Sequence, residues 1–136
     1  MSRTIKIHVS AGELVDKITI LEIKNKKITD NNKLKLIAYE LKLLSGELNK
    51  LNHNSPVSTS EFAKLKDSLC RINLRLWKIE DSIRALEANK DFGEKFIELA
   101  RNVYITNDKR SEIKNKINNL FHSQIQEVKY YTPYKK

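Results

Sequence analysis

The chain has 136 residues, of which 40% are hydrophobic and 32% are charged, and its formal net charge is +9. This length is enough for one domain with its own core, and the composition excludes an intrinsically disordered chain. Cys70 is the single cysteine, which excludes an internal disulfide and favours a reducing, cytoplasmic location, and no apolar run approaches the roughly 20 residues that a membrane span requires.

The first predicted element is a short extended segment. Residues 4–9 alternate β-branched and polar side chains, a pattern typical of a β-strand. Ser10 and Glu13 then have the spacing of a capping box, in which Ser10 accepts from backbone N–H groups and Glu13 reaches back to the helix start. The sequence therefore predicts a helix from this point to about residue 29, with a wide apolar face.

The second predicted helix follows a turn at residues 30–32. Leucine and isoleucine recur at spacings of three and four over about residues 32–52, which indicates an amphipathic helix. Residues 53–57, which include a proline, are the clearest loop in the chain.

Two more helices are predicted in the second half of the chain. Ser58 and Glu61 form another capping-box match, and the helix that they open keeps a heptad pattern of apolar residues over about residues 59–88. Residues 89–93 interrupt this pattern. A last helical pattern runs over about residues 93–121.

The end of the chain, residues 122–136, is predicted to be an extended or loosely ordered tail. Residues 124–131 alternate weakly, so they either pair with residues 4–9 as strands or remain a loose basic tail. The predicted fold class is mainly α, a single helical domain over residues 1–136. Its architecture is an antiparallel bundle of four long helices with short extended N- and C-terminal segments.

The last predicted helix has polar residues in its apolar seam. Thr106, Asn107 and Arg110 occupy core-facing positions before the seam returns at Ile113. A buried guanidinium without a partner is costly, so this pattern predicts opposing carboxylates, solvent access or a ligand. The alternative is a helix break at residues 106–108, which are three good capping types in a row.

Charged, amide and aromatic side chains also flank the apolar faces of the other helices. Together with the polar seam they give twelve candidate ligand-binding residues: Glu13, Asp16, Lys17, Lys24, Asn73, Trp77, Glu80, Asp81, Arg84, Arg101, Asn107 and Arg110. They form either an ion-pair network between helices or a pocket whose cations bind an acidic small molecule, since Arg presents a planar fork to carboxylate or phosphate. In such a pocket the carboxylates are candidate acids or bases, and whether the chain is an enzyme stays open.

Other kinds of site have weaker support in the sequence. The three histidines are scattered and no cysteine pair exists, so we expect no metal site and no cofactor. Residues 1–60 carry ten Lys/Arg against six Asp/Glu, and residues 101–136 carry eight against three. These Lys-rich ends make nucleic-acid binding a third hypothesis, but twenty of the twenty-six cations are Lys, which fits compositional drift better than a nucleic-acid site.

Three segments of the chain resemble an uncharacterised bacterial and phage family, domain of unknown function 6165. The segments are residues 10–24, residues 76–84 and, in the last predicted helix, residues 96–104 together with 107–110 and 113–114. The resemblance implies a helical domain encoded near, or fused to, sugar-transfer genes for cell-surface polysaccharide, and it implies no known activity. Residues 13–21 are also similar to the first helix of the all-helical chorismate mutases, which bind a dianion with Arg and Lys, although the flanking arginines are missing here.

The leading functional hypothesis is a helical accessory or binding module that works beside a glycosyltransferase. The third predicted helix, roughly 45 Å long at 1.5 Å per residue, has additional apolar flank and favours a homodimer. The second hypothesis is a small enzyme or sensor that binds an acidic metabolite or a sugar phosphate through the Arg, Lys and carboxylate cluster.

Overall fold

The structure is a computed structural model that describes residues 3–135, and it consists of four helices joined by short turns. The helices are α1 (Ala11–Lys27), α2 (Asn31–Asn54), α3 (Thr59–Ala88) and α4 (Glu94–Leu120). Their bounds agree with the sequence-based prediction within two residues. The prediction of a mainly α bundle is confirmed.

The first three helices begin at the side-chain caps that the sequence indicates. Ser10, Asp30 and Ser58 each accept a hydrogen bond from the backbone N–H three residues later, at 3.1, 3.0 and 3.3 Å. The carboxylate of Glu13 does not complete the predicted capping box, because it accepts a hydrogen bond from Lys114 on α4 instead. This contact ties the start of the first helix to the last one.

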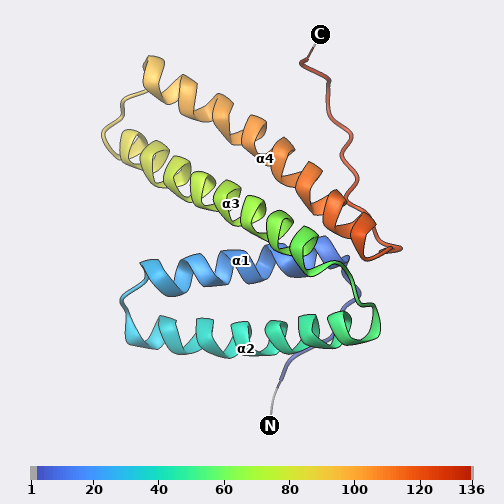
Figure 1. Cartoon of the computed structure of the whole chain (residues 1–136). Coiled ribbons are helices and arrows are strands. Elements are labelled where there is room, and N and C mark those ends of the chain that lie inside the picture. The colour runs from blue at the N-terminus through green and yellow to red at the C-terminus, as the bar shows by residue number, and fades with distance from the viewer. Residues whose placement is uncertain (1–2, 136) are drawn as a thin grey trace.

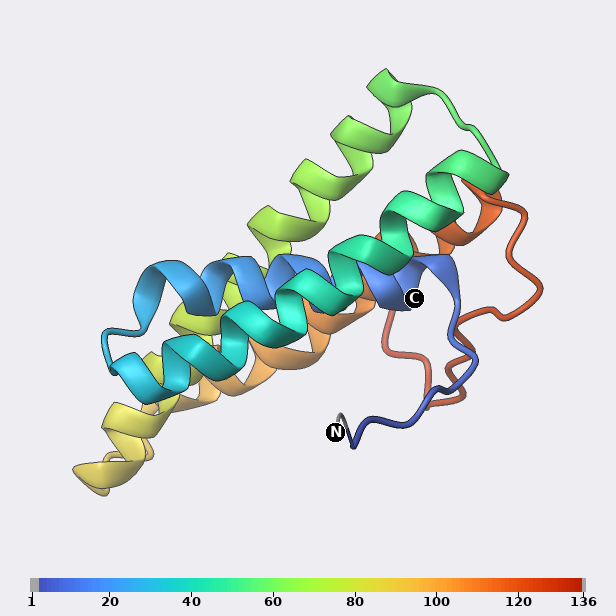
Figure 2. The ribbon, with the colours of Figure 1, turned by 90° about the horizontal axis from the view of Figure 1, so that it is seen from below.

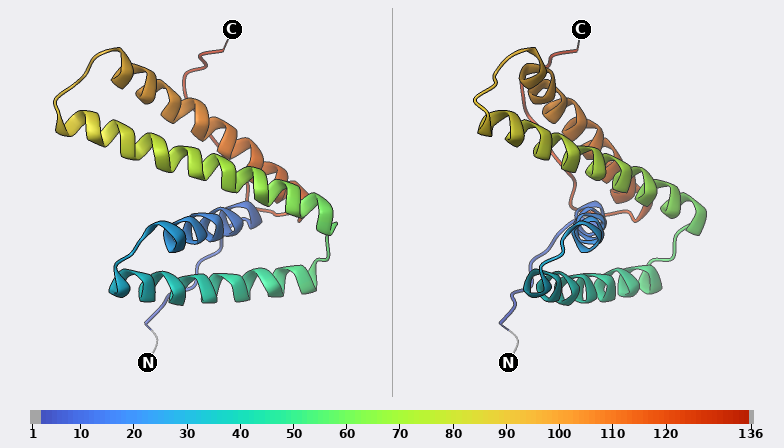
Figure 3. Two further views of the ribbon diagram at one scale, coloured as in Figure 1. Left: turned by 60° about the vertical axis from the view of Figure 1, so that its left-hand side comes forward. Right: turned by 90° about the vertical axis from the view of Figure 1, so that its left-hand side faces the viewer.

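The helices form two hairpins, α1–α2 and α3–α4, that cross one another (Figures 1 and 2). α1 packs against each of the other three helices, and α3 also packs against α4. Figure 3 shows that the hairpins spread apart towards their two turns, residues 28–30 and residues 89–93. The outer parts of α3 and α4 therefore have no helix of the first hairpin opposite them.

The hydrophobic core lies where the two hairpins meet. Val15, Leu69 and Ile117 are completely buried there, one from each of α1, α3 and α4. Phe121 also belongs to this core, and Phe62 packs against it with the two rings edge to face and their centroids 5.7 Å apart. The polar side of α1 that borders this core is the side that faces α4.

α4 is one uninterrupted helix, so the predicted alternative of a break at residues 106–108 is wrong. Thr106 is buried at 3% exposure, and Asn107 and Asp108 are half-buried. The side chains of Asn107 and Asp108 do not cap the helix, because Asn107 accepts from the Arg110 guanidinium one turn later and Asp108 accepts from Lys129 and Tyr134 of the tail.

The terminal segments do not form strands in the part of the chain that the structure describes. Residues 3–9 are extended and exposed, and they leave the bundle on the opposite side from the tail, residues 122–135 (Figure 1). The tail runs back along α4 instead of pairing with residues 4–9. Positions 1, 2 and 136 of the predicted domain lie outside the described residues. No helix within residues 3–135 is both long and apolar enough to cross a membrane.

Candidate functional site

Polar residues three and four positions apart form two stripes on α4, because such residues share one side of a helix. The two stripes face different neighbours. The inner stripe faces α1 and consists of Asn107, Arg110, Lys114 and Asn118. The outer stripe faces the tail and consists of Tyr104, Asp108, Ser111 and Asn115. α4 therefore makes polar contacts with α1 through one stripe and with the tail through the other.

Asp16 of α1 is the centre of the inner contacts and is completely buried. Its carboxylate accepts from Arg110 Nε at 3.0 Å and, at the other oxygen, from Arg110 Nη2 in a short ion pair. Asn73 Nδ2 of α3 donates to Asp16 Oδ1 at 2.8 Å and to the Thr19 hydroxyl at 2.9 Å. A buried carboxylate is thus held by a two-pronged guanidinium and an amide from two other helices.

Lys114 is surrounded by three carboxylates. Its Nζ lies 2.6 Å from Glu13 Oε2, 3.1 Å from Glu127 Oε2 and 3.6 Å from Asp16 Oδ2. Burial opposes the charge on this amine, but hydrogen bonds to Glu13 and Glu127 and the charge of Asp16 outweigh it, so the pKa of Lys114 lies above its ordinary value. Lys114 is therefore a charged, almost buried ammonium group with 4% exposure.

We call Glu13, Asp16, Arg110, Lys114 and Glu127 the ionic cluster. It contains three carboxylates and two cations, so carboxylate charge is in excess by one. Burial also opposes the charge on Arg110, but the hydrogen bond and charge of Asp16, with Glu13 and Glu127, raise the pKa of Arg110 above its usual range. Both cations remain charged and already have anionic partners.

Backbone contact at one end of the cluster fixes how closely α1 approaches α4. The N–H of Gly12 donates to Asn118 Oδ1 at 2.6 Å. A Cβ at Gly12 would lie 2.8 Å from that oxygen and would overlap the carbonyl oxygen of Lys114. Only glycine allows the start of α1 to sit this close to α4.

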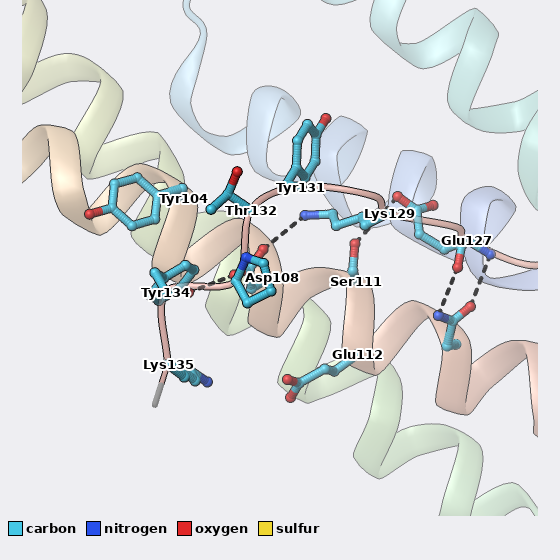
Figure 4. A pocket seen from close by; sticks show the side chains of 12 residues that line it. Tyr104, Asp108, Ser111, Glu112, Glu127, Lys129, Tyr131, Thr132, Tyr134 and Lys135 are labelled. Carbon is cyan, nitrogen blue, oxygen red and sulfur yellow. Dashed lines mark hydrogen bonds and ion pairs between the residues drawn. The ribbon is translucent and has the colours of Figure 1, made fainter.

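The tail is fastened to the outer stripe by Glu127. Asn115 binds both backbone groups of Glu127, accepting from its N–H at 3.0 Å and donating to its carbonyl at 3.1 Å. The Glu127 carboxylate accepts from the Ser111 hydroxyl at 3.3 Å (Figure 4). It also forms the ion pair with Lys114. One tail residue therefore joins the tail to the ionic cluster.

A second attachment lies further along the tail, at Asp108. Lys129 Nζ lies 3.3 Å from Asp108 Oδ1, and the Tyr134 hydroxyl donates to Oδ2 at 2.6 Å. The Tyr134 ring also meets Tyr104 edge to face at 5.2 Å. The hydrogen bond from Tyr134 lowers the pKa of Asp108 below its ordinary value, and the same bond raises the pKa of Tyr134 to about 12.

The tail and α4 enclose a groove beside the ionic cluster. One part, of about 450 Å³, is lined by Arg110, Ser111, Lys114, Glu127 and Lys129, among other residues. An adjoining part of about 660 Å³ runs under the tail towards Tyr134. The side chain of Arg110 is 27% exposed. Arg110 therefore binds buried Asp16 and also borders the groove.

The structure brings five of the twelve predicted site residues together, which are Glu13, Asp16, Asn73, Asn107 and Arg110. Another five are exposed away from the cluster, which are Lys17, Glu80, Asp81, Arg84 and Arg101. Glu80 and Arg84 pair with each other at 3.2 Å on the outer surface of α3. Lys24 and Trp77 are half-buried and make no hydrogen bond to the cluster within residues 3–135.

The sequence-based prediction missed several members of this site. Lys114 and Asn118 follow Arg110 at intervals of four, so continuing the same helical stripe would have found them. Thr19 follows Asp16 by three residues and was hidden in the apolar face of α1. Glu127 lies beyond the last helix, where no periodicity relates it to the cluster.

A known family model matches nearly the whole chain. The model of a family described as "Family of unknown function (DUF6165)" matches residues 5–135 of the chain. No curated protein and no solved structure matches.

Proposed function

Given that this chain belongs to the family of unknown function DUF6165, we propose that it is a binding module that takes an acidic small molecule in the groove between α4 and the tail. The module consists of two crossed hairpins, and its groove is next to the ionic cluster. The ligand class follows from the cations that border the groove, namely Arg110, Lys114 and Lys129.

The observation that carries this proposal is the way Arg110 is held. Three of its five N–H groups donate to Asp16 and to Asn107 Oδ1, the last at 3.4 Å. Two N–H groups, one on each terminal nitrogen, are left for another acceptor, and Arg110 is among the residues that line the groove. A guanidinium fixed in advance loses little conformational freedom when it binds a carboxylate or a phosphate.

The ionic contacts favour binding over catalysis. Every carboxylate of the ionic cluster already accepts from Arg110 or Lys114. Among residues 3–135, no buried side-chain nitrogen or oxygen lacks a hydrogen-bond partner. The carboxylates therefore serve to position the two cations, and none of them is left over as an acid or base for a reaction.

Sugar phosphates are the first ligands to test. The resemblance noted in the sequence associates this family with sugar-transfer genes, and a hexose phosphate combines a suitable anion with hydroxyl groups for the polar lining of the groove. An accessory role beside a glycosyltransferase would follow from such a ligand. The homodimer stays a prediction that light scattering checks, and nucleic-acid binding stays one that salt-dependent retention on DNA or RNA checks.

The proposal is tested by isothermal titration calorimetry with a hexose phosphate and with a dicarboxylate. Arg110→Lys keeps a positive charge beside Asp16 but removes the fork, so it should weaken binding about tenfold or more. Arg101→Lys is the matched control, since it makes the same change at an exposed position of the same helix. The control should bind like the wild type.

Two results would overturn the proposal. One is the absence of binding to the wild-type chain by any phosphate or carboxylate compound in the panel. The other is equal affinity of the wild type and Arg110→Lys, because the fixed guanidinium would then have no role in recognition.

A further inference from the structure

The carboxylate of Glu127 occupies a position that an acidic ligand would need. It forms an ion pair with Lys114, accepts from the Ser111 hydroxyl and lines the 450 Å³ part of the groove. These donors, one ammonium and one hydroxyl, are the groups that bind free carboxylates and phosphates in proteins. The carboxylate of Glu127 therefore uses donors that also suit a free carboxylate or phosphate.

Charge balance makes Glu127 the surplus member of the ionic cluster. With Glu127 in place, three carboxylates face two cations. Without it, Glu13 and Asp16 balance Arg110 and Lys114. An incoming anion is therefore repelled while Glu127 is bound, and it meets a neutral, hydrogen-bonding site once Glu127 has left.

The tail around Glu127 is held by few contacts. Val128 and Tyr131 are 86% and 80% exposed and Tyr130 is fully exposed, so their apolar side chains contribute little burial. Ser123 fastens the start of the tail to Asn118 and Ala11. Beyond it, the contacts with α4 that the structure describes are the bonds of Glu127, the bonds of Asp108 to Lys129 and Tyr134, and the ring contact of Tyr134 with Tyr104. The hydrogen bonds of Glu127 are partly buried, and those from Lys129 and Tyr134 to Asp108 are exposed. A segment with so little apolar burial opens at a lower free-energy cost than the packed helices do.

We propose that Glu127 is an internal stand-in for the acid group of the ligand, and that a carboxylate or phosphate replaces it on Lys114 and Ser111 while the tail detaches. This inference rests on the proposed binding function and adds to it the chemistry of the subsite and the competition by the tail. Binding then has two linked steps, release of Glu127 and occupation of its donors. The apparent affinity is the intrinsic affinity reduced by the fraction of molecules whose tail is open.

The test uses the full chain with inorganic phosphate and with succinate as probes. Glu127→Gln removes the surplus charge but leaves the backbone bonds to Asn115, so it should bind the preferred probe about tenfold more tightly than the wild type does. Whichever probe gains more affinity in Glu127→Gln, phosphate or succinate, identifies the acid group of the ligand as a phosphate or a carboxylate. Glu112→Gln is the matched control, because Glu112 is an exposed carboxylate that also borders the groove and makes no ion pair with Lys114.

A second measurement in the wild-type chain does not depend on any variant folding. The amide of Glu127 donates to Asn115, and the amide of Gly12 donates to Asn118 on the far side of the cluster. Saturating probe should speed hydrogen exchange at Glu127 several-fold and leave exchange at Gly12 unchanged.

The outcomes separate this inference from the proposed function. Probe binding with equal affinity in wild type and Glu127→Gln, and with unchanged exchange at Glu127, overturns the stand-in role and leaves the groove as a binding site. Tighter binding by Glu112→Gln as well as by Glu127→Gln overturns it too, because general charge would then explain both. If neither probe binds the wild type or Glu127→Gln, the stand-in role is wrong, and the proposed function falls as well if the hexose phosphate also fails to bind.

Discussion

Gly12 and Asn118 lie in direct contact although 106 residues separate them in sequence, and this contact sets the distance between α1 and α4. The backbone N–H at the start of α1 is one of those that the helix itself leaves without an acceptor, and the Asn118 side chain supplies one. The same approach leaves no room for a Cβ at Gly12.

Gly12→Ala should therefore lower the free energy of unfolding by about 2 kcal/mol or more, since overpacking costs ~1–3 kcal/mol and the hydrogen bond is strained as well. Urea unfolding measures this change. Gly46→Ala is the control, because a Cβ there meets nothing within 4 Å and should stabilise α2 by about 0.5–1 kcal/mol. Equal effects at the two positions would contradict the close contact.

The two carboxylates Asp16 and Glu80 should differ sharply in their contribution to stability. Asp16→Asn leaves a partly buried guanidinium without its anion and should cost about 3 kcal/mol, the lower end of the range for a broken buried pair, since Arg110 keeps some contact with water. Glu80→Gln removes only an exposed pair with Arg84 and should cost less than about 1 kcal/mol. Chemical unfolding of both variants in one buffer decides this, and a Glu80→Gln cost as large as that of Asp16→Asn would refute it.

The contact between Tyr134 and Asp108 should exist only within a window of pH. It needs a neutral phenol, and the pKa of Tyr134 is raised from 10.0 to about 12, so the contact is complete below pH 10 and is lost as pH rises towards 12. The contact also needs an ionised Asp108, whose pKa is lowered below its ordinary value of 3.8. The contact is therefore complete above pH 3.8 and is lost as the pH falls through the lowered pKa of Asp108. NMR titration of the Tyr134 ring should give a midpoint near 12 in the wild type and close to 10 in Asp108→Asn. A midpoint that Asp108→Asn leaves unchanged would count against the bond, and Tyr134→Phe assigns the resonance.

The helices could be predicted because their signals are local. Ser10 and Ser58 mark two starts, and the apolar spacing marks the lengths. Arg110 could be selected as a site residue because it interrupts an apolar seam. Its partner Asp16 was selected from its place beside another apolar face, and both ended in the ionic cluster.

The rest of the site depends on how the hairpins cross, which periodicity alone does not determine. Glu80 and Arg101 lie beside apolar seams just as Asp16 does, but both are exposed. The ends of α3 and α4 that meet at residues 89–93 spread away from the first hairpin (Figures 1 and 3). No helix of the first hairpin covers these ends, so charged side chains there remain in water. Glu127 reaches Lys114 only because the tail turns back along α4, and the sequence offered no signal for that direction.

The two polar stripes lie side by side on one uninterrupted helix, so α4 should not tolerate insertions or deletions between its contact residues. Adding or removing one residue between Tyr104 and Asn118 would rotate everything beyond that point by about 100°, given 3.6 residues per turn. The partners of α1 would then face the tail or the apolar interior. Variation in chain length should therefore be tolerated at the two hairpin turns and not within this stretch of α4.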